Sequence, residues 1–204
     1  MPAKSALQPQ IPLNWPKDVT YLTESRLSLD YPAALIPLLF NSSPPSPRKF
    51  APRPIHHPNY LQVKRITEAS HPARDQYGLF AKKRLAGRTL VIPYLGIIHA
   101  TFEGQVDEHE ESDYDLSLIK VSCPSSDSSG HVSIGVDAGR AGNAARFVND
   151  YRGIKSSPNA EFRSGRGEAG ELRMEIWTLT HDIRKGEEIL VSYGKGWWGA
   201  RKCA

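Results

Sequence analysis

Glycine and proline divide this chain into two parts with different backbone demands. All 16 glycines lie at or after Gly78, whereas 13 of the 16 prolines lie at or before Pro72. Proline fixes φ and removes a backbone donor, while glycine frees the backbone for tight turns. We therefore expect a proline-rich extension and linker over residues 1–58, a turn-rich domain over residues 59–198 and a tail at 199–204. Residues 42–58 are typical of an extended linker of polyproline type.

The positive charge of the chain belongs to its first third. Residues 1–75 hold nine Lys and Arg against five Asp and Glu, whereas residues 76–204 hold 17 of each, so the net +4 lies wholly before residue 76. Such a segment suits nucleic acid or another anionic surface, and a solvated basic arm is the ordinary alternative. The apolar cluster Ala33–Phe40 predicts a short helix interrupted by Pro37, which either packs on the main domain or is partly mobile.

Short β patterns separated by turn residues fill the second part. The predicted strands lie at 60–66, 89–100, 114–121, 131–138, 158–163, 171–179 and 188–193, with a bend at Pro93 or Gly96. In the 171–179 segment, Leu172, Met174 and Ile176 share one face, which is typical of a half-buried strand. One helical turn is expected within 139–149. Many short strands with few helices predict a mostly-β domain.

Several classes of protein and site are disfavoured by what the sequence lacks. It has no run of about 18 apolar residues and no apolar region at its N-terminus, so we expect a soluble intracellular protein with no transmembrane helix. Two cysteines and seven scattered histidines form no metal-ligand pattern, so we expect no metal site. No nucleophile motif of a hydrolase is present. Residues 165–170, GRGEAG, match the dinucleotide-binding string, but a strand pattern follows them, which favours a hairpin loop.

Acidic side chains crowd one segment of the domain. Its seven carboxylates are Glu103, Asp107, Glu108, Glu110, Glu111, Asp113 and Asp115. A solvated loop is the simplest interpretation. The functional alternative is a negative rim that steers a basic peptide toward a binding site.

Three clusters in a fixed order carry the most information. They are HPARDQYGLFAKKRLAGRTLVIPYLG at 71–96, DAGRAGNAARFVND at 137–150 followed by SSPNAEF at 156–162, and KGEEILVSYG at 185–194. Together they resemble the SET domain of protein-lysine methyltransferases over about residues 60–198. The family patterns are G-L-F-A, G-N-x-x-R-F-x-N-H-S-C-x-P-N and G-E-E-L-x-x-D-Y-G. The resemblance implies a mostly-β, β-clip-like fold of small curved sheets, with a knot-like crossing of the second and third motifs.

The resemblance also implies a reaction. A methyl group would pass from S-adenosylmethionine (SAM) to a lysine ε-amine of a protein, most commonly a basic histone tail, in the nucleus or alternatively the cytoplasm. The basic N-terminal segment would suit association with chromatin. Two alternatives stay open: a non-histone protein substrate, or a catalytically weak SET-like module that binds a peptide or chromatin.

Particular residues match the family's functional positions. Tyr193 is the catalytic candidate, because its hydroxyl would lie beside the donor sulfur and the target nitrogen. The cofactor-binding candidates are Tyr77, Gly78, Leu79, Tyr114, Arg146, Phe147, Asn149, Asp150 and Trp198. The candidates for the lysine channel are Tyr114, Val191 and Trp197.

The sequence departs from the family pattern at three places. Asp150 stands where the family has histidine, which changes the local charge. Residues 151–157 separate Asn149 from Pro158 by more than the usual three or four residues, so that loop is expected to reshape the cofactor pocket. Val191 stands where a larger aromatic residue usually helps to set the number of methyl groups added. The family's zinc-binding cysteine tail is also absent from this sequence.

Overall fold

The strands of this protein form small sheets that wrap around a shared core. The computed structural model describes residues 11–40, 54–122 and 130–194. Within these ranges the sheets have four, three and two strands, and two further strand pairs connect distant segments. The helices η1 (Ala33–Leu39) and η2 (Ala144–Phe147) are short 3-10 helices. The mostly-β fold predicted from the spacing of strands and turns is therefore confirmed.

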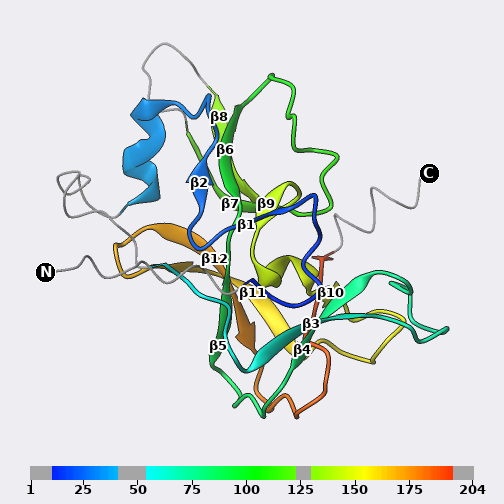
Figure 1. Cartoon of the computed structure of the whole chain (residues 1–204). Coiled ribbons are helices and arrows are strands. Elements are labelled where there is room, and N and C mark those ends of the chain that lie inside the picture. The colour runs from blue at the N-terminus through cyan, green and yellow to red at the C-terminus, as the bar shows by residue number, and fades with distance from the viewer. Residues whose placement is uncertain (1–10, 41–53, 123–129, 195–204) are drawn as a thin grey trace, which may run out of the picture.

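The four-stranded sheet occupies the upper half of Figure 1. Its order is β2-β6-β8-β7, in which β6, β8 and β7 are antiparallel and β2 lies parallel to β6. The bounds are β2 Arg26–Leu27, β6 Ile97–Phe102, β7 Asp115–Ser122 and β8 His131–Asp137. Alternate side chains of β8, among them Val132, Ile134 and Val136, are almost fully buried. One face of this sheet therefore packs against the core, as the alternating pattern predicts.

The three-stranded sheet contains the predicted hairpin. Its order is β11-β12-β5, with β11 Ala160–Arg166, β12 Leu172–Thr178 and β5 Leu90–Tyr94. The two longer strands are antiparallel from Ala160 opposite Thr178 to Arg166 opposite Leu172, so GRGEAG forms the end of a hairpin. Glu175, expected on the solvent side of β12, is buried instead. Its carboxylate accepts hydrogen bonds from Arg173 Nε (2.8 Å) and Trp177 Nε1 (2.7 Å), which satisfy the charge inside the protein.

The predicted bend between Leu90 and Phe102 falls at the glycine and not at the proline. Pro93 lies within β5, which is an edge strand and tolerates the missing N–H. At Gly96 a Cβ atom would lie 2.4 Å from the Asp137 carbonyl oxygen, so only glycine allows the chain to turn here against β8.

Residues 11–40 pack on the domain that follows them. Strand β1 (Thr20–Tyr21) pairs in parallel with β9 (Ala141–Gly142), and Leu22, Leu35 and Leu39 are buried. Helix η1 contains Pro37, which sits inside a 3-10 turn and does not end the predicted helix. The division at residue 58 stays a prediction, and the polyproline-type linker lies mostly outside the described residues.

The remaining strands bring the three sequence motifs together. Strands β3 (Leu61–Arg65) and β4 (Tyr77–Ala81) form an antiparallel pair, and β10 (Asn149–Asp150) lies parallel to β13 (Leu190–Val191). The strand expected at 188–193 is shorter in the structure, and the Asn159 side chain lies beside it: its amide nitrogen donates to the Glu188 carbonyl and its oxygen accepts from Leu190 N. The second and third motifs are thus joined by main-chain pairing. Among the described residues, no helix has the length and apolar character needed to cross a membrane.

Candidate functional site

A cavity of about 620 Å³ opens where the motifs meet. Its size is ordinary for a small-molecule site, and its lining combines aromatic and polar side chains. The walls come from the loop before β4, the loop before β7, the segment from η2 through β10, and the residue Tyr193 after β13. Predicted site residues in the lining are Tyr114, Arg146, Asn149, Asp150 and Tyr193.

Tyr193 is held at both ends by the second motif. Its hydroxyl donates to the Val148 carbonyl oxygen (2.7 Å), and its backbone N–H donates to Asp150 Oδ2 (2.8 Å). Burial raises the pKa of the Tyr193 hydroxyl well above its ordinary value, and the neighbouring Asp150 carboxylate raises it further. The phenol therefore keeps its proton near neutral pH and acts as a fixed hydrogen-bonding group.

Asp150, the residue found in place of the family histidine, connects three parts of the site. Besides the Tyr193 N–H, it accepts from Arg152 N (2.9 Å) and from Arg152 Nη1 (2.8 Å). The carboxylate is almost fully buried, while the Arg152 side chain is partly exposed. The added negative charge is therefore paired locally, and its oxygens fix the backbone of the candidate catalytic tyrosine.

Asn143, in the second motif, fixes the start of η2. This side chain is 1% exposed; its oxygen accepts from Leu95 N and Ala145 N, and its amide donates to the Pro93 carbonyl. The asparagine both caps the short helix and ties it to β5. The helix start therefore fixes where Arg146 enters the cavity wall.

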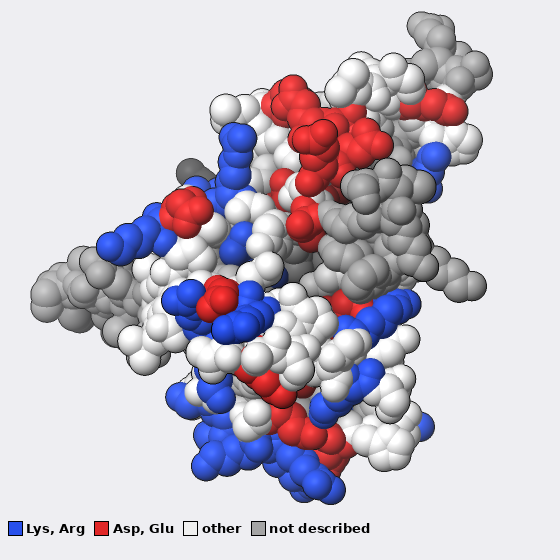
Figure 2. Space-filling model, turned by 90° about the vertical axis from the view of Figure 1, so that its right-hand side faces the viewer, with Lys and Arg blue, Asp and Glu red and all other residues white. Residues whose placement is uncertain are grey.

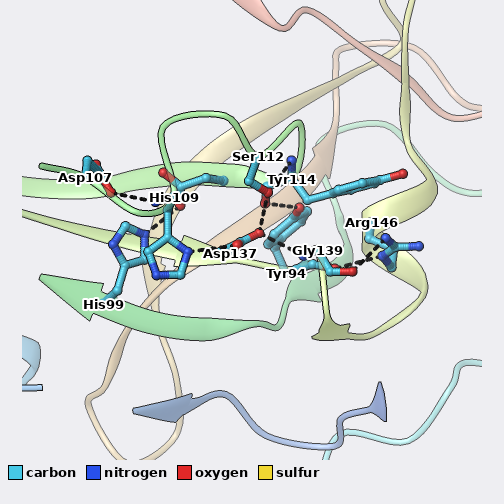
Figure 3. Close-up of polar contacts among 11 residues, drawn as sticks. Tyr94, His99, Asp107, His109, Ser112, Tyr114, Asp137, Gly139 and Arg146 are labelled. Atoms are coloured by element: carbon cyan, nitrogen blue, oxygen red, sulfur yellow. Dashed lines mark hydrogen bonds and ion pairs between the residues drawn. The ribbon is translucent and has the colours of Figure 1, made fainter. Parts of the chain in front are cut away.

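Tyr114 is fixed by a polar network at the base of the acidic segment (Figure 3). The Arg146 guanidinium lies 4.0 Å above the Tyr114 ring and donates to the Ala138 and Gly139 carbonyls. On the other side, the Tyr94 hydroxyl donates to the Tyr114 carbonyl oxygen (2.7 Å). The cation–π contact with Arg146 and the hydrogen bond from Tyr94 thus set the angle at which the Tyr114 ring faces the cavity.

The acidic segment is anchored at its base and exposed at its tip. Asp137 accepts from Ser112 Oγ (2.7 Å) and is bonded to His109 Nδ1 (2.8 Å), whose ring stacks on His99. Glu110, Asp113 and Asp115 lie in the cavity lining, and Glu103, Glu108, Glu110, Glu111 and Asp113 are exposed. Figure 2 shows a dense group of Asp and Glu side chains near the top of this face, whereas Lys and Arg side chains are spread more widely over it. One wall of the cavity is therefore negative.

Other predicted site residues lie outside the lining. Leu79 and Val191 are buried in the core, and Phe147 is buried beside Tyr77, with ring centroids 5.7 Å apart. Gly78 lies in β4 against the Glu188 carboxylate. Roles for these residues in binding or catalysis stay predictions. Trp197 and Trp198 lie outside the described residues.

The structure adds lining residues that the motifs did not single out. Tyr94 and Phe162 pack edge to face, with ring centroids 6.1 Å apart, and extend the aromatic wall of Tyr114 and Tyr193. His71 and Gln76 come from the loop before β4. Tyr94 and His71 both lie within the first quoted cluster, but Tyr94 belongs to a predicted strand, whereas no strand or helix pattern marks His71.

Comparisons with known proteins agree with this arrangement. A family model for the SET domain matches residues 76–194, which is more than half of the chain. No curated protein matches the sequence.

A solved structure of ATXR5 shows the same fold. A crystal structure of ATXR5 in complex with mono-methylated histone H3.1 matches with a TM-score of 0.55 at 17% identity, covering 87% of this chain and 82% of that one. The ATXR5 SET domain with di-methylated histone H3 matches with a TM-score of 0.48 at 22% identity; the match covers 67% of this chain but only 58% of the other. KRYPTONITE in complex with DNA, an H3 peptide and SAH matches with a TM-score of 0.42 at 20% identity, covering 66% of this chain and 23% of that one. With the family model matched across all three motifs, this chain belongs to the SET domain family.

Proposed function

We propose that this protein transfers a methyl group from SAM to the ε-amine of a lysine in a basic segment of another protein, such as a histone tail. One observation carries the proposal. In a chain of the SET domain family, Tyr193, Tyr114 and Asn149 face one cavity whose far wall carries the carboxylates of Glu110 and Asp113. A small-molecule site and a negative approach to it are thus continuous.

The residues of the cavity fit the cofactor. SAM supplies a methyl group already activated on a sulfonium, so no metal or covalent nucleophile is required of the protein. The Asn149 amide nitrogen donates both of its hydrogens, to Tyr77 O (3.3 Å) and to Glu188 Oε1 (2.7 Å), and no described residue donates to the side-chain oxygen Oδ1. This oxygen would accept from a hydroxyl or ammonium group of the cofactor, and the cavity volume is ample for a nucleoside-sized ligand.

Tyr193 would orient the target amine and would not remove its proton. Its raised pKa keeps the hydroxyl protonated, so almost no phenolate is present to act as a base, and the proton is directed at the Val148 carbonyl. Its oxygen lone pairs stay available to accept an N–H of the substrate amine. Holding the nitrogen lone pair in line with the methyl group is the contribution expected of a positioning site.

The aromatic part of the cavity would favour the neutral amine. Tyr94, Tyr114, Phe162 and Tyr193 would surround the lysine side chain with rings, and desolvation disfavours the charged ammonium. The carboxylates of the acidic segment lie on another wall, where they would attract the basic residues that flank the lysine.

Histone H3 is the first substrate to test. The ATXR5 crystal structure that shares the fold contains histone H3.1. A histone substrate would imply a nuclear location, and the basic residues of the N-terminal third would then suit association with chromatin.

The test is transfer of labelled methyl from SAM to histone H3 and to whole-cell protein by the full chain. Tyr193→Phe should lower transfer by about 100-fold. Tyr60→Phe is the matched control, because it also removes a half-buried hydroxyl that donates to a main-chain carbonyl, Val91 O, but outside the cavity lining. Equal transfer by wild type and Tyr193→Phe contradicts the catalytic assignment. Peptide binding without transfer to either pool supports the binding-module alternative.

A further inference from the structure

We propose that His71 is a positioning residue of the cofactor site: it holds Glu188, and Glu188 in turn fixes the amide of Asn149 toward the cavity. This inference rests on the proposed function. His71 lies in the loop before β4 and Glu188 lies 117 residues later, just before β13, yet His71 Nε2 and Glu188 Oε2 are 3.0 Å apart. Both side chains are at most 8% exposed.

The hydrogen bonds of His71 define its tautomer. Its Nδ1 accepts the backbone N–H of Ala73 at 3.0 Å, so that nitrogen carries a lone pair and no proton. The proton of the neutral ring is then on Nε2, where it is donated to the Glu188 carboxylate. Both ring nitrogens are used, and the imidazole is fixed in one orientation.

Glu188 links the fixed His71 ring to the side-chain amide of Asn149. Its other oxygen, Oε1, accepts from Asn149 Nδ2 at 2.7 Å. Because a carboxylate and a carbonyl can only accept, Glu188 and Tyr77 O require the nitrogen of the Asn149 amide on their side. The side-chain oxygen of Asn149, Oδ1, must therefore point away from them, and a flip of the side-chain amide would cost two hydrogen bonds.

The backbone leaves no room for Glu188 to move toward β4. A Cβ atom built on Gly78 would lie 2.5 Å from Glu188 Oε1. Gly78, which the resemblance makes a cofactor-binding candidate, thus allows the main chain of β4 to approach this carboxylate closely. The glycine is thus part of the same arrangement as His71.

His71 also attaches a wall of the cavity to the body of the protein. Its loop closes on itself through Ile66 N to Gln76 O (2.8 Å), and His71, Pro72, Ala73 and Gln76 line the cavity. Pro72 packs against Gly153, where a Cβ would lie 2.6 Å from the proline ring. The long 151–157 loop that departs from the family pattern therefore shares this wall.

The test measures binding of S-adenosylhomocysteine (SAH) to the full chain by calorimetry, together with the KM values for SAM and for the protein substrate. His71→Phe keeps a ring but removes both hydrogen bonds, and we expect about tenfold weaker SAH binding and a similar rise in the KM for SAM. The KM for the protein substrate should stay unchanged. His71→Gln restores a donor toward Glu188 and should recover most of the affinity, which a purely structural role would not require.

Further variants separate this inference from the proposed function. Gly78→Ala should also weaken SAH binding, because its Cβ displaces Glu188. Arg74→Ala, an exposed change in the same loop, should bind SAH like wild type. If His71→Phe or Gly78→Ala binds SAH as tightly as wild type, this inference alone is overturned. It is also overturned if Arg74→Ala or His71→Gln loses as much SAH affinity as His71→Phe. Failure of the wild-type chain to bind SAH overturns the proposed function and this inference with it.

Discussion

The two walls of the cavity are built in opposite ways. On the wall that includes His71, Asn149 and Asp150, with Glu188 bonded to the first two, the polar groups are mostly buried, and each makes a defined hydrogen bond to another segment. On the acidic wall, most carboxylates of residues 103–115 are exposed, and the segment is tied to β8 at two places, through Ser112 to Asp137 and through Glu103 to His131. Buried networks hold one geometry, whereas exposed charges act at a distance. We infer that the first wall sets the chemistry and the second sets the attraction of substrates.

Replacing Asp150 should have the largest effect on the first wall. Asp150→Ala removes the acceptor of Tyr193 N and of two Arg152 donors. We expect methyl transfer to fall by about 100-fold and the free energy of unfolding to fall by about 2–3 kcal/mol, measured by label transfer and urea unfolding. Asp150→Asn keeps one acceptor oxygen, so its methyl transfer and its free energy of unfolding should lie between those of wild type and Asp150→Ala. Wild-type activity in Asp150→Ala would show that Tyr193 is positioned without this carboxylate.

Trp15, a residue of the predicted N-terminal extension, packs on the segment that leads to Asn149 and Asp150. Its ring packs edge to face on Phe147 (5.6 Å between centroids) and Tyr21 (5.0 Å), and its Nε1 donates to Val19 O. Trp15→Ala should lower the free energy of unfolding by about 2 kcal/mol and raise the KM for SAM, with little change in the KM for the protein substrate. Trp15→Phe keeps the edge contacts and should lose less. An unchanged KM for SAM would confine Trp15 to a role in stability.

The sequence pointed to several residues of the cavity lining but not to the contacts that fix them. Tyr193 and Asn149 were found because they lie in motifs, and the strand patterns placed β7, β8, β11 and β12 well. The link from His71 to Glu188 joins residues 117 positions apart, and no periodicity reports such a distance. Local pattern also failed at Glu175, whose burial depends on Arg173 and Trp177 from its own strand. Side-chain pairing, across the fold for His71 and within one strand for Glu175, decided these positions, and not propensity.

The acidic wall should show a smaller effect that is limited to substrate binding. The triple variant Glu108→Gln, Glu110→Gln and Glu111→Gln removes three exposed charges. We expect the KM for a basic peptide to rise about fivefold at low salt, with the free energy of unfolding changed by less than about 0.5 kcal/mol. Added salt should raise the wild-type KM toward that of the variant, because it screens the same attraction.

A matched variant tests whether position or total charge matters. Asp18→Asn with Glu24→Gln and Glu168→Gln removes three exposed carboxylates that lie outside the cavity lining. Its KM for the basic peptide should stay near that of wild type. An equal rise in both triple variants would show that net charge, and not the acidic wall, attracts the substrate.

The base of the acidic wall should give the smallest effect, visible only through pH. Burial lowers the pKa of His99, but the hydrogen bond and charge of Asp115, with the charges of Asp107 and Asp137, outweigh it and raise the net pKa above the ordinary 6.5. The His109 ring stacks on His99, with the ring centroids 3.8 Å apart. A raised pKa in the folded state stabilises the protein fully below about pH 6.5, and that contribution is lost as the pH rises through the folded value.

His99→Gln keeps a donor toward Asp115 but cannot be protonated. Wild type should therefore exceed the variant in free energy of unfolding by less than about 1 kcal/mol at about pH 5.5, and the difference should shrink by about pH 8.5. A difference that stays constant or grows across this range in urea unfolding would show that His99 holds the acidic wall through its shape and not through its charge.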